Sequence, residues 1–301
     1  MDVQFTENKL IELFIEVDDL YKAFVAYQSS KGVSHRVTTR TPQLVASEVC
    51  TILAAYHYSG YKCFEYYYKQ LILKRYSHYF PLAPTYERFV SLIPRAADLI
   101  YFWLLYTIGG ARKTGMYFID SKKLEVCHLK REHSNKVFEG VATKGKTSTG
   151  WFFGLKLHLV INNLGQIMAC DLTPGNVADN NHEQLKKLLN ALDGYCVGDK
   201  GYHSALFDFF FHNGLRLITK PKKNMKKFPI DNKFNLLLNK RAVIESVFDI
   251  LGTICDVEHT RHRSPLNAAI HIYSALIAYQ HLEEKPQVFF PSISKKLQLA
   301  A

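Results

Sequence analysis

The hydrophobic pattern changes its period near residue 116, and this change constrains the fold more than any other feature of the chain. Before it, apolar residues recur at helical spacing in ENKLIELFIEVDDLYKAFVAY, LVASEVCTILAAYHY, CFEYYYKQLILKRY and PRAADLIYFWLLYTI. After it come short runs rich in β-branched and aromatic residues, namely MYFID, WFFGLKLHLVIN, QIMACDL, GYCVGD and LRLITK. The pattern predicts an all-helical region followed by a domain that contains a sheet.

The order of elements after this change predicts an α/β fold with a mixed sheet. Three strands come first, and the helical segments NNHEQLKKLLNAL and SALFDFFFHN then alternate with two more strands. An amphipathic helix, KRAVIESVFDILGTIC, and a second helix near LNAAIHIYSALIAYQHL follow. We therefore predict a helical region over residues 1–110, an α/β domain over residues 111–283 and a polar tail over residues 284–301. Thr41 and Pro42 are predicted as the N-cap and first position of the second helix.

The charge balance points to a polyanionic partner. Lys and Arg number 38 against 27 Asp and Glu, which gives a formal net charge of +11. Nucleic acid fits this charge best, and an acidic membrane surface is the second candidate. The longest apolar run, Leu99 to Ile108, is about half of what a bilayer span needs and predicts a core helix. The six cysteines form no C-x-x-C pair and the first residues lack a secretory pattern, so we expect a reduced, cytoplasmic protein without a membrane span.

The stretch GVATKGKT, residues 140–147, satisfies the phosphate-loop pattern G-x-x-x-x-G-K-[ST]. A phosphate loop must leave a buried strand and enter a helix. Here the preceding KREHSNKVFE is strongly charged, and the following residues show the alternation of a strand. We interpret the stretch as a mobile, basic, Gly-rich loop between two strands, expect no nucleotide cofactor, and regard Lys144 and Lys146 as phosphate contacts.

Three carboxylates stand out by their placement. Asp120 ends MYFID, Asp199 ends GYCVGD, and Glu245 lies one turn into the last amphipathic helix. The ends of neighbouring strands form a crevice that a packed helix can overlook. Carboxylates meeting there repel one another unless cations lie between them, and oxygen ligands suit Mg²⁺ or Mn²⁺. Each residue has an alternative role, as a turn former, a helix cap or a solvated surface acid.

Other polar residues form a second tier of candidates. An edge-strand or turn role explains Asp171, and Asp179 is interpreted as the cap of the next helix. Metal ligation is one alternative for His182, Glu183 and the cluster EHTRHR, but a surface helix and phosphate contacts are favoured. A basic run between Thr219 and Arg241 is either a solvated loop or a contact for a polyphosphate. The basic residues that we regard as candidate DNA contacts here are Lys220, Lys222, Lys223, Lys226, Lys227, Arg241, Arg261 and Arg263.

Four segments, taken together and in order, resemble the DDE transposases of bacterial insertion sequences. They are MYFIDSKKLEVC, GWFFGLKLHLVINNLGQIMACDLTPGNVADNN, GYCVGDKGYHS and KRAVIESVFDIL, and the resemblance covers about residues 110–265. It implies an RNase-H-like core in which Asp120, Asp199 and Glu245 carry two divalent ions. It also implies that Arg241 helps to hold DNA phosphates or transposon ends.

The resemblance implies an activity and its partners as well. The expected reaction is metal-dependent cleavage at the element ends, followed by transfer of the freed 3′-hydroxyl into target DNA. The expected partners are double-stranded DNA and a second copy of the chain on paired ends, in the bacterial cytoplasm and on the nucleoid when DNA is bound. Related transposases often carry a Tyr and a Lys where this chain has Leu238 and Gly252. The alternatives are an RNase-H-like nuclease without strand transfer and an inactive DNA-binding relative.

Overall fold

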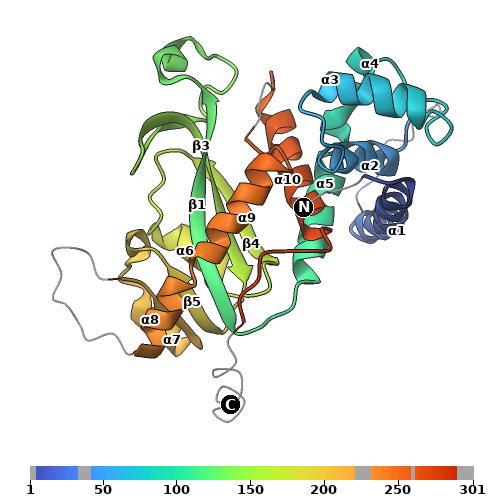
Figure 1. Ribbon diagram of the computed structural model, residues 1–301. Coiled ribbons are helices and arrows are strands. Elements are labelled where there is room, and N and C mark those ends of the chain that lie inside the picture. Colours follow the sequence, from blue (N-terminus) through green and yellow to red (C-terminus); the bar gives the residue numbers. More distant parts are fainter. Residues whose placement is uncertain (1–4, 33–41, 221–231, 259–261, 290–301) are drawn as a thin grey trace. The chain divides into compact units, whose positions relative to one another are not determined.

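The computed structural model describes residues 5–32, 42–220, 232–258 and 262–289, and it divides into two compact units (Figure 1). Unit 1 comprises Met1–Gly109 and Ile250–Leu282, and unit 2 comprises Gly110–Asp249 and Glu283–Ala301. The sequence places residues 250–282 in the α/β domain, whereas the structure groups them with the N-terminal helices. The physical reason is that helix α10 (Pro265–Gln280) is apolar on nearly all sides and packs against helices of unit 1.

Unit 1 is helical, as the periodicity predicts. Its cores come from helices whose apolar residues recur every three or four positions, such as Leu10, Leu13 and Val17 of the first helix. Besides α10, its elements are α1 (Glu7–Ser30), α2 (Ala46–Tyr56), α3 (Phe64–Tyr67), the π-helix η1 (Tyr68–Arg75), α4 (Tyr86–Leu92), the 3₁₀ helix η2 (Ile93–Ala96) and α5 (Ala97–Gly109).

The start of α2 differs from the prediction. The helix begins at Ala46, and the Glu48 side chain accepts a hydrogen bond of 2.8 Å from the backbone N–H of Val45. Pro42 precedes the helix, and Thr41 lies outside the described residues. Glu48 therefore satisfies a free N–H group at this terminus, a role that the sequence assigns to Thr41.

One continuous helical stretch, Tyr86–Gly109, is long and apolar enough to cross a membrane by length and composition alone. It joins α4, η2 and α5 and is therefore longer than the ten-residue apolar run that the sequence shows. Within unit 1, Leu99, Ile100, Trp103 and Leu104 of this stretch are buried. Such burial is typical of a core helix in a folded protein. A core helix and a membrane-spanning helix can have the same length and apolar composition.

Unit 2 is built on a mixed sheet, as predicted, and this sheet has six strands rather than the five expected. Its strands are β1 (Met116–Cys127), β2 (Thr143–Thr147), β3 (Gly150–Asn162), β4 (Ile167–Pro174), β5 (Gly194–Gly198) and β6 (Leu215–Ile218). The order is β2-β3-β1-β5-β6, and β4 also pairs with β3. β3 is antiparallel to β1, β2 and β4, whereas β5 and β6 run parallel to β1 and to each other.

Successive residues of β1 point to opposite faces of the sheet, and different helices contact the two sets of residues. Tyr117 and Ile119 belong to a core with Leu185 of α6 (His182–Leu189) and Phe210 of α7 (Phe207–His212). The alternate residues Asp120 and Lys122 contact the last amphipathic helix, α9 (Ala242–Thr253), and the residue just before it. Within unit 2, Lys122 Nζ donates a hydrogen bond of 3.2 Å to the carbonyl of Phe248, so this part of α9 lies along β1 (Figure 1).

Three local predictions for unit 2 are wrong. β1 continues past Asp120 to Cys127, so Asp120 lies within a strand rather than at its end. The stretch Thr143–Thr147, interpreted as a loop, forms β2. The basic segment before Arg241, also interpreted as a loop, ends in the helix α8 (Asn232–Asn239). In β2 the exposed Lys144 and Lys146 flank the buried Gly145, and the second half of β1 carries several charged residues. Cross-strand pairing with β3 overrides this polarity.

Candidate functional site

Asp120 lies within β1, next to Leu159 of β3 in the strand register. Its Oδ1 accepts a hydrogen bond of 2.9 Å from the backbone N–H of Ser121. Burial raises the pKa of the Asp120 carboxyl above its ordinary value, and the negative charge of Asp199 raises it further, against the opposing effects of Ser121 and Arg241. The carboxylate is therefore held where water solvates it poorly and where a cation is favoured.

Asp199 is brought beside Asp120 by the pairing of parallel strands. Gly198, the last residue of β5, is the register partner of Ile119, so the next residue on each strand is one of the two aspartates. The backbone N–H of Gly201 donates to Asp199 Oδ1. A Cβ at position 201 would lie 3.1 Å from that oxygen, which is tighter than ordinary contact. Glycine at this position therefore lets the backbone approach the carboxylate.

Glu245, in the first turn of α9, is connected to Asp120 through one guanidinium. Arg241 Nη1 donates a hydrogen bond of 2.7 Å to Asp120 Oδ2, and Arg241 Nη2 donates one of 2.5 Å to Glu245 Oε1. The side chain of Glu245 is 58% exposed, whereas those of Asp120 and Arg241 are each 23% exposed. The structure thus places Asp120 on β1, Asp199 directly after β5 and Glu245 on α9, with Asp120 linked to Glu245 through Arg241.

A cavity of about 440 Å³ opens at the two aspartates. Lysines and small polar residues line it together with the aspartates, so the cavity combines negative and positive charge. The lining residues are Asp120, Ser121, Lys123, Lys146, Thr147, Ser148, Lys156, Asp179, Asp199, Lys200, Gly201 and Tyr202. The composition is polar and basic, which suits a phosphate-bearing ligand.

Asp179 belongs to this cavity, although the sequence assigns it to the cap of the next helix. The N-cap of α6 is Asn181, whose side chain accepts from the backbone N–H of Gln184. Asp179 Oδ1 accepts instead from Ser121 Oγ at 2.8 Å and from Lys156 Nζ at 3.2 Å. The sequence signal for this role of Asp179 is Lys156, a lysine inside an otherwise apolar strand. Lys156 is only 7% exposed, and a buried lysine requires an acidic or carbonyl partner.

The donor atoms at the cavity fit a hard divalent cation in part. Carboxylate oxygens are the ligands that Mg²⁺ and Mn²⁺ prefer, and Asp120 and Asp199 present them at one cavity. Among the residues that the structure describes, no three His, Cys, Asp or Glu side chains lie close enough together to hold a metal ion. The third predicted ligand, Glu245, is paired with Arg241, so it would join the other two only after that pair separates.

The predicted DNA contacts are dispersed. Lys144 and Lys146 lie on β2, and Lys146 lines the cavity. Lys220 follows β6 and is exposed, and Arg263 is an exposed residue of unit 1. Five of the predicted contacts lie outside the described residues, namely Lys222, Lys223, Lys226, Lys227 and Arg261. Asp171, for which an edge-strand or turn role is predicted, lies in β4, which pairs with β3, and forms an ion pair of 2.6 Å with Lys187 of α6.

A comparison with known protein families identifies unit 2. Residues 110–265, more than half of the chain, match a family model described as a transposase DDE domain. No curated protein matches the chain. The matched residues include every strand of the sheet, the two aspartates Asp120 and Asp199 that line the cavity, and Glu245, which is paired with Arg241.

Proposed function

The chain belongs to the transposase DDE-domain family, and on this premise we propose that it is the DNA transposase of an insertion sequence. The proposed reaction is cleavage at the element ends followed by transfer of the freed 3′-hydroxyl into target DNA. The observation that carries the proposal is that Asp120 and Asp199, from adjacent parallel strands, line one basic cavity. Arg241 links Asp120 to Glu245 of α9. The mixed sheet with its antiparallel β3 and parallel β5 and β6 is consistent with the RNase-H-like core that the family implies.

Asp120, Asp199 and Glu245 are proposed as the ligands of two Mg²⁺ or Mn²⁺ ions. Bound there, such ions would activate a water molecule and stabilise the leaving oxygen of an in-line displacement. Asp120 and Asp199 already present their oxygens together, and Arg241 holds Glu245 near them. If its two carboxylate partners were held by a cation instead, the guanidinium of Arg241 could donate two parallel hydrogen bonds to a DNA phosphate.

Double-stranded DNA, both element ends and target, is the proposed partner. Lys146, Lys123 and Lys200 line the cavity, so the DNA backbone would approach the carboxylates along positively charged walls. We assign recognition of the element ends to the helical region over residues 1–110. We further propose that two copies of the chain act together on paired element ends. The proposed location is the cytoplasm, and the nucleoid when DNA is bound.

One observation supports an inactive, DNA-binding relative as the second candidate. Related transposases carry a Tyr at the position of Leu238, and here the side chain is apolar and only 6% exposed. A buried leucine cannot donate a hydrogen bond to DNA. Gly252, where relatives carry a Lys, likewise offers no charge. If these contacts are required, binding would persist without cleavage.

A single gel assay tests the proposal. Purified protein is incubated with labelled duplex DNA carrying the element ends, with target plasmid and Mg²⁺, and cleaved and joined products are resolved together. Cleavage with joining supports the transposase, whereas cleavage without joining supports the nuclease. Binding without metal-dependent cutting identifies the inactive relative, and neither binding nor cutting overturns the proposal.

A further inference from the structure

The β2–β3 hairpin presents one buried and one exposed face. Lys146 and Trp151 are direct cross-strand partners, and Lys144 lies two residues before Lys146, so these three side chains share a face. The opposite face is packed: Phe152 is 1% exposed, and a Cβ at Gly145 would lie 2.1 Å from the carbonyl oxygen of Gly175. Packing of one face therefore fixes the orientation of the other.

Trp151 lies on the exposed face, where a large aromatic side chain is unusual. It is 55% exposed, whereas the other tryptophan of the chain, Trp103, is fully buried. Lys144 Nζ lies 5.5 Å and Lys146 Nζ 5.4 Å from the centroid of the Trp151 ring. An exposed indole with two ammonium groups near its ring combines a stacking surface with positive charge.

The hairpin also borders the catalytic cavity. Lys146, Thr147 and Ser148 line this cavity together with Asp120 and Asp199. Among the residues that the structure describes, Lys146 has no carboxylate partner, so its ammonium can meet a phosphate. Whatever binds Trp151 and Lys146 therefore lies next to the proposed site of cleavage.

A nucleotide with an unpaired base fits this surface. Lysines match its phosphate, and an aromatic ring matches the flat face of its base, as in proteins that bind single-stranded nucleic acid. Within a duplex each base face is covered by its neighbours, so a side chain cannot stack on it without unstacking the strand. The chemistry of the face thus selects a frayed or single-stranded nucleotide over paired DNA.

We propose that Trp151, flanked by Lys144 and Lys146, is a stacking platform for an unpaired base beside the scissile phosphate. This inference rests on the proposed function, since it takes the cavity to be the place where a DNA strand is cut. It adds a requirement that the carboxylates alone do not impose, which is that the end of the duplex opens at the hairpin.

The test measures binding in metal-free buffer to labelled oligothymidylate and to a blunt duplex. We expect Trp151→Ala to weaken oligothymidylate binding by about tenfold and to leave duplex binding unchanged, and Trp151→Phe to retain most of the affinity. Phe211→Ala is the matched control, because Phe211 is 62% exposed on α7 of the same unit and has no lysine over its ring among the described residues. Emission of the unmodified protein provides a second measurement: oligothymidylate should quench it, and Trp151→Phe, which retains only the buried Trp103, should show no quenching.

Unchanged oligothymidylate binding by Trp151→Ala, or an equal loss on both DNAs, overturns the inference, as does the absence of quenching. The cleavage assay described above is run on the same preparations. If the unmodified protein cuts DNA while Trp151→Ala binds oligothymidylate normally, the inference fails and the proposed function stands. If the selective loss is seen and the unmodified protein never cuts, the stacking platform stands and the proposed function fails.

Discussion

Arg241 Nη1 donates a hydrogen bond of 2.7 Å to Asp120 Oδ2, which joins the residue before α9 to the middle of β1. The same guanidinium donates to Glu245, so one cation neutralises two of the three proposed catalytic carboxylates. Any divalent ion that takes Asp120 and Glu245 together as ligands must compete with this guanidinium. The stability of unit 2 and its response to metal are therefore linked through Arg241.

Arg241→Gln should lower the melting temperature in the presence of a chelator. It leaves two neighbouring carboxylates without their cation, one of them largely buried, and a charge left unpaired in this way is strongly destabilising. Added Mg²⁺ should then raise the melting temperature of the variant more than that of the unmodified protein, because the competing guanidinium is gone. Thermal unfolding followed by circular dichroism, with chelator and with Mg²⁺, measures both effects.

Lys187→Gln is the control for this experiment. It also breaks an ion pair in unit 2, with Asp171, but neither residue lines the cavity. Its response to Mg²⁺ should equal that of the unmodified protein. Equal Mg²⁺ shifts for Arg241→Gln and the unmodified protein would show that the guanidinium does not compete with metal.

Asp199→Asn should reduce DNA cleavage on the order of a thousandfold or more while leaving DNA binding largely intact. The amide preserves the shape of the side chain and one acceptor for the N–H of Gly201, but it removes the charge that the proposed metal requires. Asp171→Asn, outside the cavity, should cleave normally. Full cleavage by Asp199→Asn in Mg²⁺ would remove Asp199 from the proposed site.

Gly145→Ala should destabilise the β2–β3 hairpin. The added methyl group would lie 2.1 Å from the carbonyl oxygen of Gly175 and 2.6 Å from the ring of Phe152, so the backbone must move. Overpacking of this kind costs about 1–3 kcal/mol, and chemical denaturation measures it as a loss in free energy of unfolding. Gly109→Ala, where nothing lies within 4 Å of the added atom, is the control and should be neutral or slightly stabilising. Equal stability of Gly145→Ala and the unmodified protein would contradict the close packing at this glycine.

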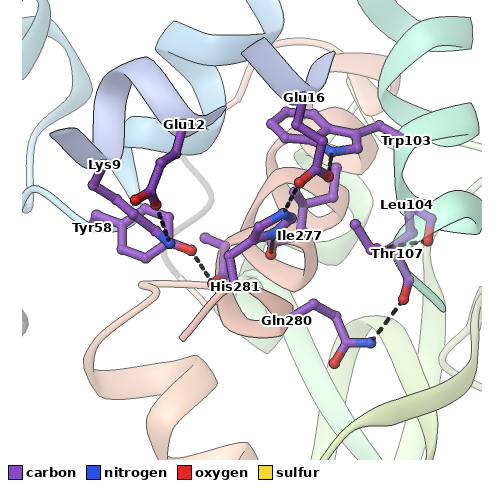
Figure 2. Close-up of polar contacts among 11 residues, drawn as sticks. Lys9, Glu12, Glu16, Tyr58, Trp103, Leu104, Thr107, Ile277, Gln280 and His281 are labelled. Carbon is purple, nitrogen blue, oxygen red and sulfur yellow. Dashed lines mark hydrogen bonds and ion pairs between the residues drawn. The ribbon is translucent and has the colours of Figure 1, made fainter. Parts of the chain in front are cut away.

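Glu16→Gln should destabilise unit 1 in a pH-dependent way. Figure 2 shows Glu16 between Trp103, whose Nε1–H donates to Oε1 at 2.6 Å, and His281, whose Nε2 lies 2.9 Å from Oε2. Burial acts to raise the pKa of Glu16, but the hydrogen bond and charge of His281 and the hydrogen bond of Trp103 outweigh it and hold this pKa below its ordinary value of 4.5. A lowered pKa of an acid stabilises the folded state above the unfolded pKa, and this stability is lost as pH falls through the folded pKa.

We therefore expect Glu16→Gln to lower the free energy of unfolding by about 1 kcal/mol at pH 6, because it removes a charged partner of His281. The difference from the unmodified protein should shrink as the pH falls from 4.5 through the lowered folded-state pKa, because only below that pKa is the carboxylate protonated in both folded and unfolded states. Fluorescence of the buried Trp103 reports unfolding of this unit. A difference that stays constant from pH 6 to pH 3 would exclude the charge of Glu16 as its cause.

Much of the architecture follows from local patterns. The helical region up to Gly109 and the apolar runs of β3, β4, β5 and β6 have the periodicity of the elements they form, and the structure confirms both the α/β class and the mixed sheet. The sequence also indicates the position of Asp199. The end of a short apolar run marks the end of a strand, and the cavity lies where β5 ends.

Other features depend on partners distant in the chain. The stretch Thr143–Thr147 is polar, and only its pairing with β3 and the packing of Gly145 on Gly175 make it a strand. Asp179 does not cap the next helix as predicted, because its carboxylate accepts hydrogen bonds from Ser121 and the nearly buried Lys156.

The sequence by itself determined most of the helices and strands and which carboxylates follow or enter them, because the period of apolar residues decides which face each element can bury. It did not determine the polar strand β2 or the full length of β1. Only the tertiary structure decided that Arg241 lies between Asp120 and Glu245, and that Trp151 shares an exposed face with Lys144 and Lys146 beside the cavity. The physical reason is that strand register and helix packing set distances between residues far apart in the chain, and no local pattern encodes those distances.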